Sequence, residues 1–147
     1  MMKIGFIGTG LMGLPMAKNL LKSDFKLKVF NRSINKAEPL KEFGAEISKT
    51  LGEVVKDNDF IITMLTDDVA VDAIMNNSDF LENLKSGSTV IDMSSVKPTT
   101  ATKYRNSLKS KNVNYLDAPV SGGTIGAEEA SLAVSYTHLT LPTSDLG

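Results

Sequence analysis

The sequence alternates short apolar runs with amphipathic segments through residue 118, and this alternation limits the folds open to it. Each apolar run is rich in β-branched or aromatic residues, as buried strands are. The runs occupy 3–8, 26–30, 60–65, 89–93 and 114–118. The segments between them place apolar side chains at helical spacing, and they occupy 12–22, 35–43, 51–56, 67–76 and 98–111. Strands that alternate with helices form parallel sheets, so we predict an α/β fold with a mainly parallel sheet.

Four residues mark where the predicted helices begin and end. Asp67 is a predicted N-cap, and Pro98 suits a first helical turn. Gly44 and Gly87 follow apolar-periodic segments, as glycines that end helices do. A length of 147 residues is close to the commonest domain size, so one domain is expected.

Glycines separate the first predicted strand from the first predicted helix. Gly8, Gly10 and Gly13 form the pattern G-x-G-x-x-G, which is informative only in this strand-to-helix context. The first glycine permits a tight turn, the second lets backbone approach a diphosphate, and the third allows close packing of helix on strand. Free N–H groups and the positive end of the helix dipole then hold the anion. We therefore predict a dinucleotide-binding turn; the alternative is a glycine-rich loop without a ligand.

The second predicted strand ends at Asn31, Arg32 and Ser33, roughly 20 residues after the glycine turn. Domains that prefer NAD usually carry Asp or Glu here, because a carboxylate accepts hydrogen bonds from the ribose 2′-hydroxyl. This sequence has no carboxylate there to repel a 2′-phosphate, and the Arg32 guanidinium can hold one with a charge-assisted bond. Ser33 and Lys36 can add contacts. We predict that NADP is preferred over NAD; the alternative is a surface arginine in a loop.

Composition and charge argue against several other functions. The 16 Lys and Arg residues nearly balance the 17 Asp and Glu residues, so no nucleic-acid partner is expected. The absence of cysteine excludes disulfides and thiolate chemistry, and no apolar stretch is long enough to span a membrane. We expect a cytoplasmic protein with no metal site. One group of basic residues is interpreted as a solvated helix face: Lys97, Lys103, Arg105, Lys109 and Lys111.

A family resemblance rests on four stretches: GFIGTGLMGLPMAKNL, NRS, ITML and LDAPVSGGTIGAEEASL. Together they resemble the β-hydroxyacid dehydrogenases, which include 3-hydroxyisobutyrate dehydrogenase, tartronate semialdehyde reductase and glyoxylate/succinic semialdehyde reductases. The resemblance covers residues 2–133. It implies an N-terminal domain with a Rossmann-type, doubly wound, mainly parallel sheet. It also implies a C-terminal helical domain, absent from these residues, that builds a homo-oligomer. It also implies hydride transfer between NAD(P) and a small 3-hydroxy acid or semialdehyde.

The resemblance also assigns cofactor contacts by position. Leu11 and Met12 would join the three glycines under the diphosphate, and Asn31 and Arg32 would face the adenosine ribose. The remaining assigned positions are Leu65 and Thr66 on the adenine side and Ser95 near the nicotinamide ribose. Many family members have proline where this sequence has Thr66, so its contact is less specific than that of Leu65.

The stretch DAPVSGG resembles the family's substrate-binding signature. The Ser121 hydroxyl and the backbone N–H groups of Gly122 and Gly123 suit the carboxylate of a small anionic substrate. The alternative is a turn that ends a strand. The family's proton-transfer lysine lies some fifty residues further on by resemblance, so we assign no catalytic residue within this sequence. Glu128 and Glu129 are interpreted as structural.

The last residues depart from the family pattern. Residues 134–147 read VSYTHLTLPTSDLG and resemble the in-frame translation of a sequencing adapter. We therefore expect a dinucleotide-binding domain over residues 1–133 and a non-native tail over 134–147, although a divergent C-terminal strand is the alternative. His138, the single histidine, lies in this tail and is not assigned a role.

The sequence leaves three functions open. The preferred one is the NADP-binding domain of an oxidoreductase for small hydroxy acids or semialdehydes, inactive by itself. The second is an imine reductase-like enzyme on the same scaffold. The third is a non-catalytic dinucleotide-binding module, because fold alone does not establish chemistry.

Overall fold

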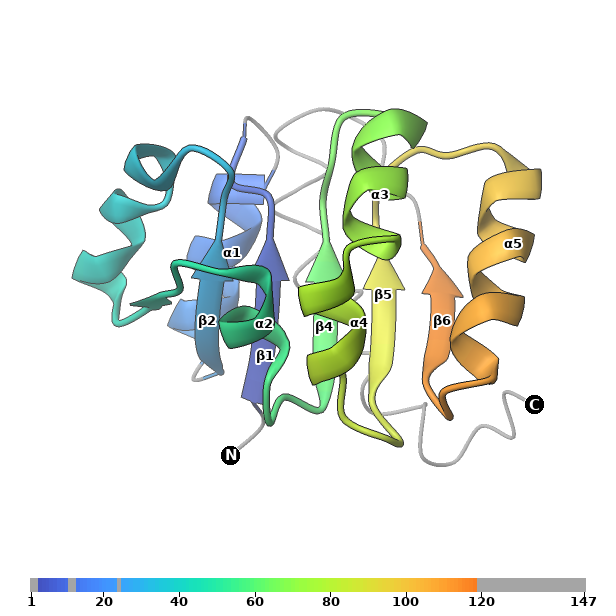
Figure 1. Cartoon of the computed structure of the whole chain (residues 1–147). Coiled ribbons are helices and arrows are strands. Elements are labelled where there is room, and N and C mark those ends of the chain that lie inside the picture. The colour runs from blue at the N-terminus through green and yellow to red at the C-terminus, as the bar shows by residue number, and fades with distance from the viewer. Residues whose placement is uncertain (1–2, 11–12, 24, 119–147) are drawn as a thin grey trace.

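The computed structural model describes residues 3–10, 13–23 and 25–118. Its strands form one parallel sheet in the order β3-β2-β1-β4-β5-β6, which is the strand order of a Rossmann fold (Figure 1). The strands are β1 (Lys3–Ile7), β2 (Lys26–Phe30), β3 (Glu46–Ile47), β4 (Phe60–Thr63), β5 (Thr89–Asp92) and β6 (Asn114–Asp117). The predicted fold class is confirmed. The strand order reverses between β1 and β4, so the loops that follow these strands open a crevice at the carboxyl edge of the sheet.

Helices cover both faces of the sheet (Figure 1). On one face lie α1 (Gly13–Lys22) and the 3-10 helix η2 (Glu38–Phe43), which follows the short 3-10 helix η1 (Ile34–Lys36) in the chain. On the other face lie α2 (Leu51–Val55), α3 (Asp68–Met75), α4 (Ser78–Asn83) and α5 (Pro98–Lys109). Consecutive strand residues point to opposite faces. Phe6 therefore packs in the core with α1, while Ile7 packs in the core beneath α2 to α5.

The predicted end signals are confirmed at three of four positions. The Asp67 carboxylate accepts a hydrogen bond of 2.9 Å from the Ala70 N–H and caps α3. Pro98 occupies the first turn of α5, and Gly44 ends η2 with a φ of 97°. The prediction for Gly87 is wrong, because α4 ends at Asn83 with Leu84 as its C-cap. Gly87 instead lies in the turn before β5, where its φ is 89°.

The structure corrects three further expectations. The single helix predicted over 35–43 is two 3-10 helices, because Pro39 has no N–H to donate and lies in the first turn of η2, which begins at Glu38. The edge strand β3 was not predicted because two residues show no periodicity. Helix α4 was also not predicted, although Asn77 gives a cap signal by accepting a bond of 3.0 Å from the Phe80 N–H. Among the described residues, no helix is long and apolar enough to cross a membrane.

Candidate functional site

The glycine turn joins the end of β1 to the start of α1, and two of its glycines are required by close backbone packing. Gly8 has a φ of 102°, and a Cβ added there would lie 2.2 Å from the carbonyl oxygen of Met64. A Cβ on Gly13 would lie 2.0 Å from the carbonyl oxygen of Gly8. Gly8 therefore permits the tight turn, and Gly13 permits the helix to begin against that turn, as the spacing predicts.

Gly10 differs from both of its partners. A Cβ added there would meet no heavy atom of the described residues within 4 Å, and its φ is not positive. The fold itself therefore does not require glycine at this position. Gly10 is exposed and lines a pocket, so its missing side chain leaves space on the side from which a ligand would approach.

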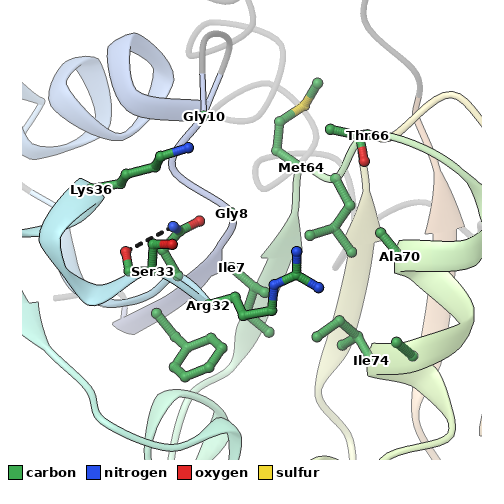
Figure 2. Close-up of a pocket in the computed structure, with 14 residues that line it drawn as sticks. Ile7, Gly8, Gly10, Arg32, Ser33, Lys36, Met64, Thr66, Ala70 and Ile74 are labelled. Atoms are coloured by element: carbon green, nitrogen blue, oxygen red, sulfur yellow. Dashed lines mark hydrogen bonds between the residues drawn. The ribbon is translucent and has the colours of Figure 1, made fainter.

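The pocket lies at the carboxyl edge of β1, β2 and β4 and has a volume of about 290 Å³. Figure 2 shows Lys36 extending toward the glycine turn and Arg32 extending toward the opposite wall. That opposite wall comes from the end of β4 and from α3. Its lining residues are Met64, Leu65, Thr66, Ala70, Ala73 and Ile74. One side of the pocket is therefore cationic and the other is largely apolar.

The Asn31 side chain connects two loops of the pocket. Its Oδ1 accepts a hydrogen bond of 2.9 Å from the Thr9 N–H, and its Nδ2 donates one of 2.9 Å to the Ser33 carbonyl oxygen. The expectation from the family was that Asn31 faces the adenosine ribose. In the structure Asn31 lines the pocket, and its polar atoms hold the glycine turn against the loop that carries Arg32.

The wall formed by Leu65 is held from behind by a serine that the sequence did not single out. Ser94 is fully buried, and its Oγ accepts a hydrogen bond of 2.8 Å from the Leu65 N–H. Ser95, which is predicted near the nicotinamide ribose, is exposed and lies outside the lining of this pocket, so its predicted contact stays a prediction. Two adjacent serines after a strand give no periodicity signal, so the sequence does not reveal which of them points inward.

A buried polar cluster lies behind this wall at the ends of β4, β5 and β6. Asp92 is fully buried and accepts hydrogen bonds from the Thr63 hydroxyl at 2.9 Å and the Tyr115 hydroxyl at 2.6 Å. Burial, followed by the bond to Asp92, raises the pKa of the Tyr115 hydroxyl above its ordinary value. Burial and the Asp92 charge also raise the pKa of Asp117, against a smaller opposing effect of Arg105.

Several predicted residues lie outside the described residues. They are Leu11, Met12, Ser121, Gly122, Gly123, Glu128, Glu129 and the whole of 134–147, together with the proposed domain boundary at 133. The basic residues assigned to a solvated face are all exposed, along or beside α5. Within the part of the chain that the structure describes, no three His, Cys, Asp or Glu side chains gather as they would around a metal ion.

A parallel sheet with this strand order, a glycine turn after its first strand and a pocket at its switch point defines a Rossmann-type dinucleotide-binding domain. The family described as the NAD binding domain of 6-phosphogluconate dehydrogenase matches residues 3–137. The chain belongs to this family.

Several known proteins that are similar to this chain are oxidoreductases by name. Glyoxylate/succinic semialdehyde reductase 1 of Arabidopsis thaliana is 36% identical over 134 residues, which are 90% of this chain and 46% of that protein. The solved structure of Mycobacterium tuberculosis 3-hydroxyisobutyrate dehydrogenase with L-serine has a TM-score of 0.83 at 28% identity, covering 96% of this chain and 51% of that one. An imine reductase from Myxococcus stipitatus in complex with NADP⁺ has a TM-score of 0.78 at 26% identity, covering 85% and 43%.

The resemblance to β-hydroxyacid dehydrogenases is thereby confirmed. The chain spans about half the length of the curated relatives it matches.

Proposed function

We propose that this chain is the NADP-binding domain of an oxidoreductase that transfers hydride between NADP(H) and a small 3-hydroxy acid or semialdehyde. The observation that carries the proposal is the charge of the pocket. Its described lining contains Arg32 and Lys36 and no Asp or Glu. A 2′-phosphate would therefore meet two cations and no carboxylate at the end of β2.

Different groups of the described residues suit different parts of a dinucleotide. The open side of Gly10 and the first turn of α1 suit the diphosphate. Arg32, Ser33 and Lys36 suit the 2′-phosphate, and Leu65 and Thr66 suit one side of the adenine. When bound, the nicotinamide supplies or accepts the hydride. We place Leu11 and Met12 at the diphosphate and Ser95 toward the nicotinamide ribose by resemblance alone.

The expected ratio of NADP to NAD affinity follows from the energy of a hydrogen bond to a charged group. A hydrogen bond to a charged group contributes about 1.5 to 3 kcal/mol, which corresponds to a preference of roughly 10- to 100-fold. Calorimetric titration of the chain with NADPH and NADH measures this ratio directly. Equal affinities, or tighter binding of NADH, would remove Arg32 from its proposed role.

A pair of variants separates a specific contact from a change in overall charge. Arg32→Ala should weaken NADPH binding roughly 10-fold or more and leave NADH binding nearly unchanged. Lys26→Ala is the matched control, since it removes one exposed positive charge from the other end of the same strand. If both variants weaken NADPH binding equally, the effect is a long-range electrostatic one rather than a contact with the 2′-phosphate.

The substrate side of the proposal rests on residues beyond those that the structure describes. We propose that Ser121, Gly122 and Gly123 bind the substrate carboxylate. We propose, by resemblance, that the acid/base lysine of the family is not among residues 1–147, so the chain by itself should not turn over succinic semialdehyde, tartronate semialdehyde or 3-hydroxyisobutyrate. Measurable turnover would contradict this.

We also propose that residues 1–133 form the dinucleotide-binding domain and that residues 134–147 are not native. The gene sequence downstream of codon 133 tests this boundary. The parent protein is proposed to be a homo-oligomer.

A second candidate is an enzyme that reduces imines on the same scaffold. It is favoured by the likeness to the imine reductase of Myxococcus stipitatus, which was solved with NADP⁺. The same pocket would bind the cofactor in either enzyme, so binding measurements do not separate the two. Assays of the parent protein with a cyclic imine and with a semialdehyde do.

A further inference from the structure

One carboxylate joins the ends of three neighbouring strands at the carboxyl edge of the sheet. Asp92 is the last residue of β5 and is fully buried. It accepts hydrogen bonds from the Thr63 hydroxyl on β4 at 2.9 Å, from the Tyr115 hydroxyl on β6 at 2.6 Å, and from the Ser94 N–H at 3.0 Å. A carboxylate is costly to bury unless such donors compensate it.

The cluster reaches the pocket wall through the side chain of Ser94. Asp92 fixes the backbone of Ser94, and the Ser94 hydroxyl oxygen in turn accepts the Leu65 N–H at 2.8 Å. Leu65 and the residue after it line the pocket. Two consecutive hydrogen bonds thus connect a buried carboxylate to the wall that faces Arg32.

The bond to Ser94 satisfies an N–H group of the loop after β4 that no strand partner reaches. The Leu65 N–H lies just past the end of β4, where the ladder of strand hydrogen bonds stops at Thr63 and Met64. Without Ser94 this N–H would lack its partner in a partly buried place, and the loop would have to move to hydrate it.

We propose that Asp92 and Ser94 are positioning residues that hold the Leu65–Thr66 wall in the geometry required for nucleotide binding. The proposal rests on the proposed function of the pocket. Asp92 acts through Ser94 and does not touch the ligand. The two residues therefore tune affinity for the adenosine part of the cofactor without contributing a contact of their own.

The experiment compares Ser94→Ala, Ser94→Thr and Asp92→Asn in the full chain of 147 residues. Ser94→Ala should weaken NADPH binding roughly 2- to 10-fold, the effect of one lost hydrogen bond. It should also speed hydrogen exchange of the Leu65 amide relative to the amides of β1, as measured by NMR. Ser94→Thr restores a hydroxyl and should recover both values. Asp92→Asn should weaken binding in the same direction.

Asn58→Ala is the control for a general loss of stability. Asn58 is buried at the opposite edge of the sheet, where its Nδ2 donates a bond of 2.6 Å to the Val54 carbonyl oxygen. This variant should lower the free energy of unfolding without changing the dissociation constant for NADPH or the exchange of the Leu65 amide.

The outcomes are separable. If the unsubstituted chain binds NADPH but Ser94→Ala and Asp92→Asn bind it equally well, the positioning inference is overturned and the proposed function survives. If Asn58→Ala weakens binding as much as Ser94→Ala, the inference is also overturned, because stability alone explains the loss. If the unsubstituted chain binds neither NADPH nor NADH, the proposed function and the inference fail together.

Discussion

Substituting alanine for two glycines of the same turn should separate folding from binding. Gly10→Ala adds a methyl group that meets no described heavy atom within 4 Å, and the backbone there has no positive φ. The folded state therefore gains no clash. Because alanine restricts the unfolded chain more than glycine does, the free energy of unfolding should be unchanged or higher by about 0.4 to 1 kcal/mol.

The same methyl group should nevertheless weaken cofactor binding. It fills the space from which the diphosphate would approach the backbone of the turn. Adding a group to a closely packed contact costs about 1 to 3 kcal/mol, which corresponds to NADPH binding that is roughly 5- to 150-fold weaker. NADH binding should weaken by a similar factor, since the diphosphate is common to both.

Gly13→Ala should show the opposite balance. The new Cβ would lie 2.0 Å from the Gly8 carbonyl oxygen and 3.0 Å from its carbon, and backbone atoms cannot rotate away as a side chain can. We expect a loss of unfolding free energy of about 1 to 3 kcal/mol or more. Urea denaturation and calorimetric titration of both variants provide the test. A Gly10→Ala chain that binds NADPH as tightly as the unsubstituted chain would refute the placement of the diphosphate at this turn.

Two further predictions concern stability. Asp67→Ala removes the N-cap of α3 and should lower the free energy of unfolding by about 0.5 to 2 kcal/mol in urea denaturation; no change would show that the cap contributes nothing. Burial and the neighbouring Asp92 charge raise the folded-state pKa of Asp117 above its ordinary value of 3.8, so the fold favours the protonated carboxyl group. The stability this group contributes is present at low pH and is lost as pH rises through the raised pKa. Asp117→Asn should therefore raise the free energy of unfolding at pH 7, and raise it progressively less as pH falls toward 3.8. An increase that is the same at every pH would contradict the raised pKa of Asp117.

Local patterns predicted most of the elements and the glycine turn. The strands other than β3, and helices α1, α2, α3 and α5, follow from apolar periodicity and from caps such as Asp67, because these signals act within a few residues. The elements that were missed carry weak local signals. Strand β3 has two residues, and the break between η1 and η2 depends on one proline inside an otherwise periodic segment.

The candidate site also contains residues that the sequence predicts and residues whose roles only the structure shows. The sequence alone predicted the glycine turn and Arg32 as dinucleotide-binding candidates from their spacing to strand ends. The structure places Gly8, Gly10 and Arg32 around one pocket. Tertiary structure decided the hydrogen-bonding roles of the other residues around the pocket. Asn31 holds two loops together, and Ser94 supports the pocket wall. Those roles depend on which strands become neighbours, and strand order is set by packing both faces of the whole sheet, which no local pattern encodes.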